Sequence, residues 1–236
     1  MKILLTPLLL FIASCSEKPR LESENVQSPN RDWDTSFFAP VVGETLIYQQ
    51  NHEYILPDQR RPIQSDQIEK VITLRKQTYL GPIEIDGQTF HQNAVSFDDQ
   101  FREGILLSWN GEMLSLAGSF DQNAKPKLQP IFIPFAQIDM QVGTYWKWPN
   151  EMIRGSGSRV VGFGKVSVPA GTFEAFKISI KRGISSKIYV KEYWFAPRIG
   201  IVKEVNRRYS GGLLRTLTTI ELIERVSPES DASSSS

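Results

Sequence analysis

Alternating apolar and polar positions recur along most of the chain and predict β-strands. In the clearest case, Phe176, Ile178 and Ile180 occupy one face of an extended segment, while Lys177 and Lys181 occupy the other. A period of two indicates a strand with one buried side and one solvent-exposed side. Turn residues interrupt the chain roughly every ten positions, and helix-length periodic windows are few, which is typical of all-β proteins.

Three turns with defined chemistry separate predicted strands. Residues 86–87 read Asp-Gly and residues 110–111 read Asn-Gly, the dipeptides that tolerate the positive φ of type I′ hairpin turns. Residues 168–171 read Val-Pro-Ala-Gly, where proline presets φ at the second position and glycine suits the fourth. Each turn therefore predicts a hairpin between neighbouring strands.

Further strands are expected at 188–195, 201–205 and 213–223. Short links between neighbours imply antiparallel order, and a sheet of this length curls rather than staying flat. We therefore expect an all-β fold: a single antiparallel, strongly curled sheet, an open or half β-barrel, with few or no helices. Segment 65–74 fits two structures, because Ser65 would cap a helix whereas Val-Ile-Thr-Leu at 71–74 favours a strand. We favour the strand.

A short internal sequence similarity relates residues 38–48 to residues 137–146. In each segment Val-Gly leads into an aromatic strand. One hypothesis is a duplication of half the sheet, for which a single short match is weak support.

The first residues predict export. Lys2 and the amino terminus form a positive region, residues 3–12 are mostly apolar, and small residues precede Cys15. The apolar run is shorter than the ~20 residues that span a bilayer. The arrangement resembles a bacterial lipoprotein signal, which implies diacylglycerol on the Cys15 thiol, cleavage after Ser14 and acylation of the new amino terminus. The alternative is an ordinary secretory signal with an incidental cysteine.

The same resemblance implies a location and a layout. Ser16 stands where aspartate would be the retention cue, so outer-membrane sorting with the protein facing the periplasm is expected. We expect a signal peptide over 1–14, a lipidated tether over 15–36, a β domain over 37–225 and a disordered tail over 226–236. Because Cys15 is the only cysteine, the folded part has no disulfide.

Charge divides unevenly along the chain. Residues 15–146 carry 11 Lys and Arg against 18 Asp and Glu, whereas residues 147–225 carry 15 against 6. One interpretation is a basic face, built around Arg207, Arg208 and Arg215, that docks lipid headgroups, an envelope polymer or a partner protein. The other, which we favour, is that acidic and basic strands lie side by side and pair across the sheet. Export makes nucleic acid an unexpected partner.

Aromatic residues supply the candidate binding site. Trp146 and Trp148 share one strand face, Trp194 adds aromatic surface, and Phe176 and Ile178 share one face of another strand. These five residues either line an apolar cavity on the concave side of the sheet, which would hold an acyl chain or another hydrophobic ligand, or belong to a filled core.

Four segments resemble the successive signatures of an uncharacterised group of bacterial envelope proteins. They are 38–48, 142–146, 168–173 and 193–203, and the match as a whole runs from about residue 38 to residue 205. The group is similar to the DUF3108-type β proteins and, more distantly, to the half-barrel lipoprotein carriers related to LolA. The resemblance implies a curled β-sheet and supplies no catalytic residues.

One position departs from the group pattern, because Arg198 stands where its members usually have glycine. The turn at Ala196-Pro197 is therefore expected to differ in shape from that of the group.

Signals for catalysis are poor. His52 and His91 are the only histidines, and neither has Cys, Asp or Glu at the spacing of a zinc site, so no metal or cofactor is predicted. A hydrolase would need a carboxylate pair drawn from Asp98, Glu103 and Glu192, and a scattered arrangement of these residues would end that hypothesis.

Three functions follow from these patterns. The first is a lipid-anchored envelope protein that carries or senses a hydrophobic ligand and is not an enzyme. The second is a structural or assembly partner that uses the basic C-terminal strands. The third, and least favoured, is a hydrolase.

Overall fold

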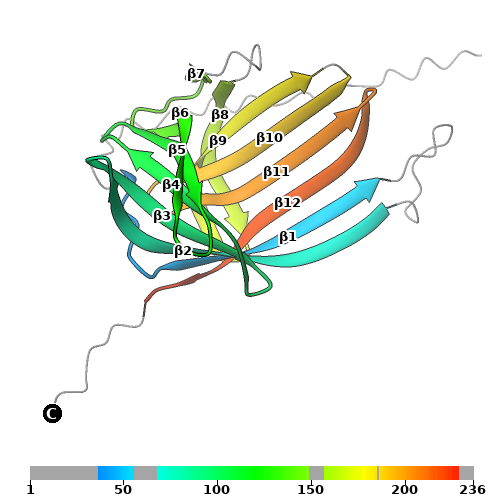
Figure 1. Ribbon diagram of the computed structural model, residues 1–236. Coiled ribbons are helices and arrows are strands. Elements are labelled where there is room, and N and C mark those ends of the chain that lie inside the picture. Colours follow the sequence, from blue (N-terminus) through cyan, green and yellow to red (C-terminus); the bar gives the residue numbers. More distant parts are fainter. Residues whose placement is uncertain (1–36, 56–67, 149–156, 185, 229–236) are drawn as a thin grey trace, which may run out of the picture.

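A single antiparallel sheet of twelve strands makes up the protein in the computed structural model, which describes residues 37–55, 68–148, 157–184 and 186–228 (Figure 1). The sheet order is β6-β5-β4-β3-β2-β1-β12-β11-β10-β9-β8-β7. The strands are β1 (Thr45–Ile55), β2 (Ile68–Ile85), β3 (Gln88–Phe97), β4 (Gln100–Trp109), β5 (Met113–Phe120), β6 (Pro126–Gln137), β7 (Tyr145–Lys147), β8 (Gly157–Val168), β9 (Gly171–Ile184), β10 (Lys187–Ala196), β11 (Gly200–Ser210) and β12 (Leu213–Val226).

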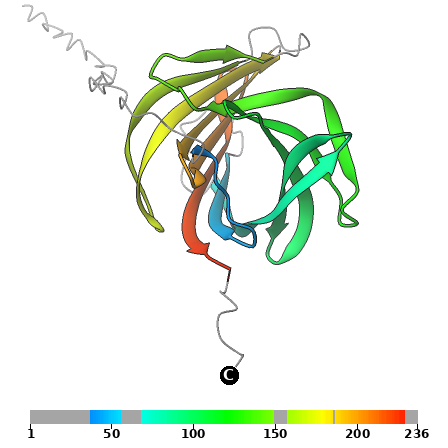
Figure 2. The same ribbon diagram turned by 90° about the vertical axis from the view of Figure 1, so that its left-hand side faces the viewer.

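The expected all-β fold is confirmed, and the sheet curls further than a half barrel. It closes nearly into a barrel with one seam, at which the edge strands β6 and β7 do not pair. Figure 2 shows the curvature of the sheet from the side. Pairing of β1 with β12 joins the first strand to the last, from Thr45 opposite Val226 to Tyr54 opposite Thr216. No helix in the described part of the chain is long and apolar enough to cross a membrane.

The predicted hairpins are present, with one difference in turn geometry. Asp86 and Gly87 both have positive φ, of 51° and 75°, as a type I′ turn requires. At the second hairpin only Gly111 has positive φ. Asn110 instead accepts hydrogen bonds at Oδ1 from the backbone N–H groups of Glu112 and Met113, at 3.0 and 2.7 Å. Its side chain therefore closes the turn, as asparagine often does.

The ambiguous segment is a strand where the structure describes it. β2 begins at Ile68 and pairs with β1 as far as Thr78, and its second half pairs with β3. The strands expected at 188–195, 201–205 and 213–223 are confirmed as parts of β10, β11 and β12. Residues 1–36, with the signal, Cys15 and the tether, lie outside the described residues, as does the tail beyond 228.

The internal similarity between residues 38–48 and 137–146 corresponds to a repeated local structure. The N–H of Gly43 donates to Tyr79 O and the N–H of Tyr79 donates to Glu44 O. One hundred residues later, the N–H of Gly143 donates to Val160 O and the N–H of Val160 donates to the carbonyl of Thr144. The same turn therefore begins each six-stranded half of the sheet, β1–β6 and β7–β12, which agrees with the hypothesis of a duplicated half.

Buried apolar side chains form three clusters. The largest lines the barrel interior beside the seam and includes Phe37, Phe176 and Tyr193. A second gathers Leu46, Ile220 and neighbours near the β8–β9 turn, whose Ala170 N–H donates to Leu222 O at 3.1 Å. The third packs Phe90 and Leu106 between β3 and β6. Leu106 and Leu107 are both buried although they alternate along β4, so both faces of this part of the sheet are covered.

The β10–β11 turn retains the backbone conformation that glycine favours, although Arg198 occupies it. Arg198 has φ of 70° and Gly200 has φ of 107°. The backbone of Arg198 therefore adopts the left-handed conformation in spite of its side chain. An L-residue with a Cβ pays a conformational cost there.

This cost predicts the order of two substitutions. Arg198→Gly should be more stable than Arg198→Ala by about 1 kcal/mol, because both remove the side chain and only glycine relieves the backbone. Urea denaturation measures the difference. Lys165 is the control, because it is an exposed β8 residue outside the left-handed region. There the alanine variant should be more stable than the glycine variant. Equal stability of the two Arg198 variants would contradict the strain.

Candidate functional site

A cavity of about 360 Å³ lies inside the curled sheet. Side chains from nine strands line it, and the segment 37–40 forms part of its wall. Leu107 and Leu114 come from the β4–β5 hairpin, and Phe135 comes from β6 at the seam. Most of the lining is apolar, and the volume lies in the range of small-molecule pockets.

Phe37 fixes the segment that leads into β1. Its ring lies 5.8 Å from that of Trp109 and 5.3 Å from that of Phe195, measured between centroids, and its side chain is fully buried. Its carbonyl accepts a 2.9 Å hydrogen bond from the backbone N–H of Arg198. This hydrogen bond holds segment 37–40 against the β10–β11 turn. The segment therefore forms part of the cavity wall although it is not a β-strand.

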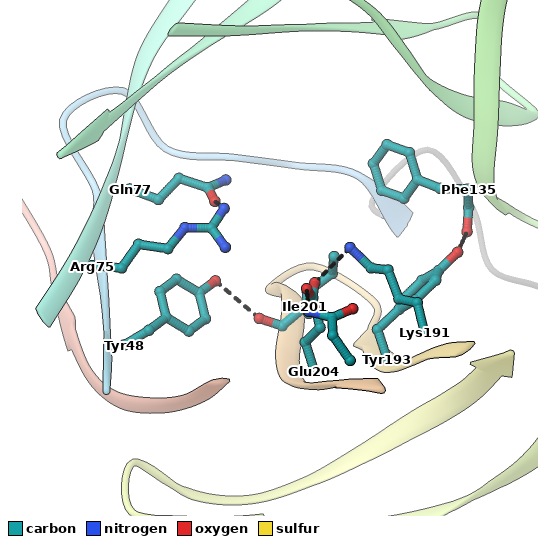
Figure 3. Close-up of polar contacts among 9 residues, drawn as sticks. Tyr48, Arg75, Gln77, Phe135, Lys191, Tyr193, Ile201 and Glu204 are labelled. Atoms are coloured by element: carbon teal, nitrogen blue, oxygen red, sulfur yellow. Dashed lines mark hydrogen bonds and ion pairs between the residues drawn. The ribbon is translucent and has the colours of Figure 1, made fainter. Parts of the chain in front are cut away.

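Two groups of polar side chains enter the cavity from opposite walls (Figure 3). Tyr48 of β1 and Arg75 and Gln77 of β2 form the first. The Tyr48 hydroxyl donates to Ile201 O at 2.9 Å, and the Arg75 guanidinium carbon lies 5.6 Å from the centre of the Tyr48 ring. Burial raises the pKa of Tyr48, so its hydroxyl keeps the proton that it donates.

The second group is a charged cluster on β10 and β11. Lys191 Nζ lies 2.7 Å from Glu204 Oε2, and Asn206 Nδ2 donates to Glu204 Oε1 at 2.6 Å. Burial alone would raise the pKa of Glu204, but Lys191 and Asn206 together lower it below its ordinary value. Glu204 is therefore a buried carboxylate with both oxygens occupied.

Side chains bridge the seam where backbone pairing is absent. Trp146 Nε1 donates to Pro134 O at 2.9 Å, and the Tyr193 hydroxyl donates to Phe135 O at 2.6 Å. Both acceptors are carbonyls of β6, whose outer edge has no partner strand. These bonds join β6 to side chains of β7 and β10.

The five aromatic and aliphatic candidates occupy three environments. Trp148 lines the cavity, and its Nε1 donates to Ser158 Oγ at 3.1 Å. Trp146, Phe176 and Ile178 are buried in the largest core cluster rather than at the cavity surface. Trp194 alternates with the cavity-lining Tyr193, so it leaves the sheet on the opposite face, where the Nζ atoms of two lysines lie 5.0 and 5.8 Å from its ring centre.

The three candidate arginines of the basic face do not share a surface. Arg207 pairs with Glu192 at 2.5 Å, whereas Arg208 extends to the other side of β11 and its guanidinium carbon lies 5.1 Å from the Tyr189 ring centre. Arg215 lies at an irregularity in the pairing of β12 with β11. Lys177 also pairs with Glu192, so cross-strand ion pairs account for part of the basic charge.

The remaining chemical candidates are dispersed. Asp98 and Glu103 lie at the β3–β4 hairpin, and Glu192 lies on β10, with β2, β1, β12 and β11 between them in the sheet. The Nδ1 atoms of His52 and His91 form hydrogen bonds with Thr218 and Tyr79. Within the described ranges no three His, Cys, Asp or Glu side chains gather as metal ligands.

Sequence reasoning missed the polar part of the cavity. Arg75, Gln77 and Tyr79 alternate on one face of β2, which is the period-two signal of a strand. Their direction, toward the barrel interior, follows only from the pairing of β2 with β1, which the sequence does not reveal.

Residues 135–213, about a third of the chain, match the DUF3108-like family. This confirms the resemblance for the segment that contains the motifs at 168–173 and 193–203. No curated protein matches the chain.

Two solved structures are similar to the chain. One is an inferred exported protein with a YmcC-like fold from Bacteroides fragilis, with a TM-score of 0.47 and 13% identity over 81% of this chain and 99% of that one. The other is an inferred lipoprotein from Parabacteroides distasonis, with a TM-score of 0.46 and 11% identity over 82% of this chain and 99% of that one.

The Glu204 cluster predicts a pH dependence of stability. Since its pKa is lowered on folding, its ionised form stabilises the protein fully above the unfolded-state value near 4.5, and this contribution is lost as pH falls through the folded-state value. Glu204→Gln should therefore flatten the acid loss of unfolding free energy, measured by urea denaturation at successive pH values. Glu224→Gln, at an exposed position of β12, is the control. An unchanged slope in Glu204→Gln would contradict the assignment.

Proposed function

We propose that the protein is a lipid-anchored envelope protein that binds a hydrophobic ligand inside its curled sheet. The observation that carries this proposal is the cavity of about 360 Å³, walled by Leu107, Leu114, Phe135 and similar side chains. An apolar cavity with a few polar groups is the usual form of a small-ligand site. The protein acts by holding its ligand, not by transforming it, and carriage or sensing are the roles that fit.

The seam supports access to this cavity. Phe135 lines the cavity and also belongs to β6, the strand whose outer edge is unpaired. Two side-chain hydrogen bonds span this edge, from Trp146 and Tyr193, in place of a backbone ladder. Separating β6 from β7 and β10 across the seam, with its pairing to β5 kept, therefore breaks few bonds, and a long apolar molecule enters there.

The amino-terminal pattern supports the anchor. Cys15 is the only thiol of the chain and follows the small residues of a lipoprotein signal. A diacylglycerol on Cys15, with the serine at position 16 directing the protein to the outer membrane, would hold the β domain near its source of apolar ligand. Acylation through two or more chains gives stable attachment, whereas one chain gives only marginal binding.

Substitution of the cysteine tests the anchor. Cys15→Ala should abolish incorporation of radiolabelled palmitate and move the protein from the membrane fraction to the soluble fraction. Ser16→Ala is the matched control and should retain the label. Labelled Cys15→Ala protein would contradict the assignment of the lipid to this thiol.

Filling the cavity tests ligand binding. Leu116 lines the cavity from β5, and Leu116→Trp should occupy part of its volume. We expect about a tenfold loss of affinity for the uncharged apolar fluorophore N-phenylnaphthylamine, followed by its fluorescence.

Leu213→Trp is the control, because it adds the same ring at an exposed position of β12. Circular dichroism establishes that both variants are folded. Equal affinity in both variants would place the fluorophore outside the cavity, and no binding to the unsubstituted protein would overturn the proposed function.

A further inference from the structure

Arg75 enters the apolar cavity with most of its hydrogen-bonding capacity unused. Its Nη2 donates to Gln77 Oε1 at 3.4 Å, near the limit of a hydrogen bond. Its Nε is buried without a hydrogen-bond partner. Among the ion pairs of the described residues, none includes Arg75. Arg75 is half-buried, and its guanidinium makes no ion pair with a carboxylate of the described residues.

The two carboxylates that line the same cavity are already engaged. Glu204 contacts Lys191 and Asn206, and Glu44 accepts hydrogen bonds from Nε and Nη2 of Arg225 at 3.1 and 2.5 Å. Glu204 acts on Arg75 only through longer-range electrostatics. The positive charge of Arg75 is therefore not neutralised by direct contact with either carboxylate.

Neighbouring neutral donors are engaged as well. The Tyr48 hydroxyl donates to Ile201 O, and Gln77 Nε2 donates to Asn93 Oδ1 at 3.3 Å. Arg75 is consequently the charged group of this part of the cavity that makes no ion pair and retains N–H donors for a ligand. A guanidinium presents them as a planar fork, which fits the oxygens of a carboxylate or a phosphate.

We propose, on the basis of the proposed function, that the ligand is an acyl-chain amphiphile with an oxyanion head, and that the Arg75 guanidinium binds this head while the chain lies against the apolar wall. Arg75 approaches from β2, whereas Leu107, Leu114 and Phe135 come from β4, β5 and β6. Arg75 thus faces the cavity from a different part of the barrel wall than these three apolar side chains, as an amphiphile requires. Charged hydrogen bonds formed away from bulk water are stronger than neutral ones.

Matched single-chain probes test this assignment. Dodecanoate and dodecanol share a chain and differ in the charge of the head, so their affinities for the protein, measured by isothermal titration calorimetry below micelle formation, isolate the contribution of the oxyanion. We expect dodecanoate to bind at least about tenfold more tightly. Dodecyl phosphate distinguishes the two possible heads. Tighter binding of dodecyl phosphate than of dodecanoate assigns a phosphate ligand, and tighter binding of dodecanoate assigns a carboxylate.

Substitution of Arg75 assigns the selectivity to this residue. In Arg75→Gln, the affinity for dodecanoate should fall to that for dodecanol, while the affinity for dodecanol stays unchanged. Arg208→Gln is the matched control, because it also removes an arginine stacked on a tyrosine, and Arg208 does not line the cavity. This control should retain the full preference for dodecanoate.

The outcomes separate the two proposals. Equal binding of dodecanoate and dodecanol to the unsubstituted protein would overturn the oxyanion head and leave the apolar cavity intact. Binding of neither probe would overturn the proposed function itself. A preference that persists in folded Arg75→Gln would overturn the role of Arg75. Should that variant fail to fold, the preference of the unsubstituted protein must weaken with added salt, and a preference independent of salt would contradict recognition by charge.

Discussion

The antiparallel pairing of β1 with β12 is the constraint on which the rest of the structure depends. It joins the first strand to the last through a ladder from Thr45 opposite Val226 to Tyr54 opposite Thr216. Every other pairing in the sheet is between strands adjacent in the chain, so this is the one strand pairing that joins the two six-stranded halves. Contacts between residues so distant in sequence carry a large loop-closure cost, and such topologies fold slowly.

The same pairing determines where the sheet remains open. With β1 and β12 joined, the edges fall on β6 and β7, which are consecutive in the chain. β7 has three residues, so it is too short to form a ladder along the twelve residues of β6. Hydrogen bonds from Trp146 and Tyr193 to β6 carbonyls take its place. An exposed strand edge is ordinarily a liability for aggregation, and this edge is partly covered by side chains of its own barrel.

Patterns with local causes could be predicted from the sequence, and features set by the closure of the sheet could not. Asp86-Gly87 and the turn at 168–171 determine their hairpins through backbone preferences of the residues themselves, and both are present. Trp194, an aromatic residue in a strand, fits either a cavity wall or a filled core when the sequence alone is considered. Its alternation with Tyr193 places it on the other face, and only the pairing of β10 with β9 and β11 determines which face is interior.

The polar residues of the cavity illustrate the same limit in energetic terms. Arg75 and Glu204 are charged residues on strands, and a sequence pattern favours solvent for such residues because burial of an uncompensated charge is costly. The negative charge of Glu204 is neutralised by Lys191 on the neighbouring strand β10. An ion pair between adjacent strands of a hairpin is a contact that sequence reasoning can anticipate. Arg75 is not compensated in this way, although it extends into an apolar interior. The residue is half-buried, and its Nε is enclosed without a hydrogen-bond partner, which is an unfavourable state for a polar atom. The oxyanion head that we propose for the ligand would supply the partner that this guanidinium lacks among the described residues.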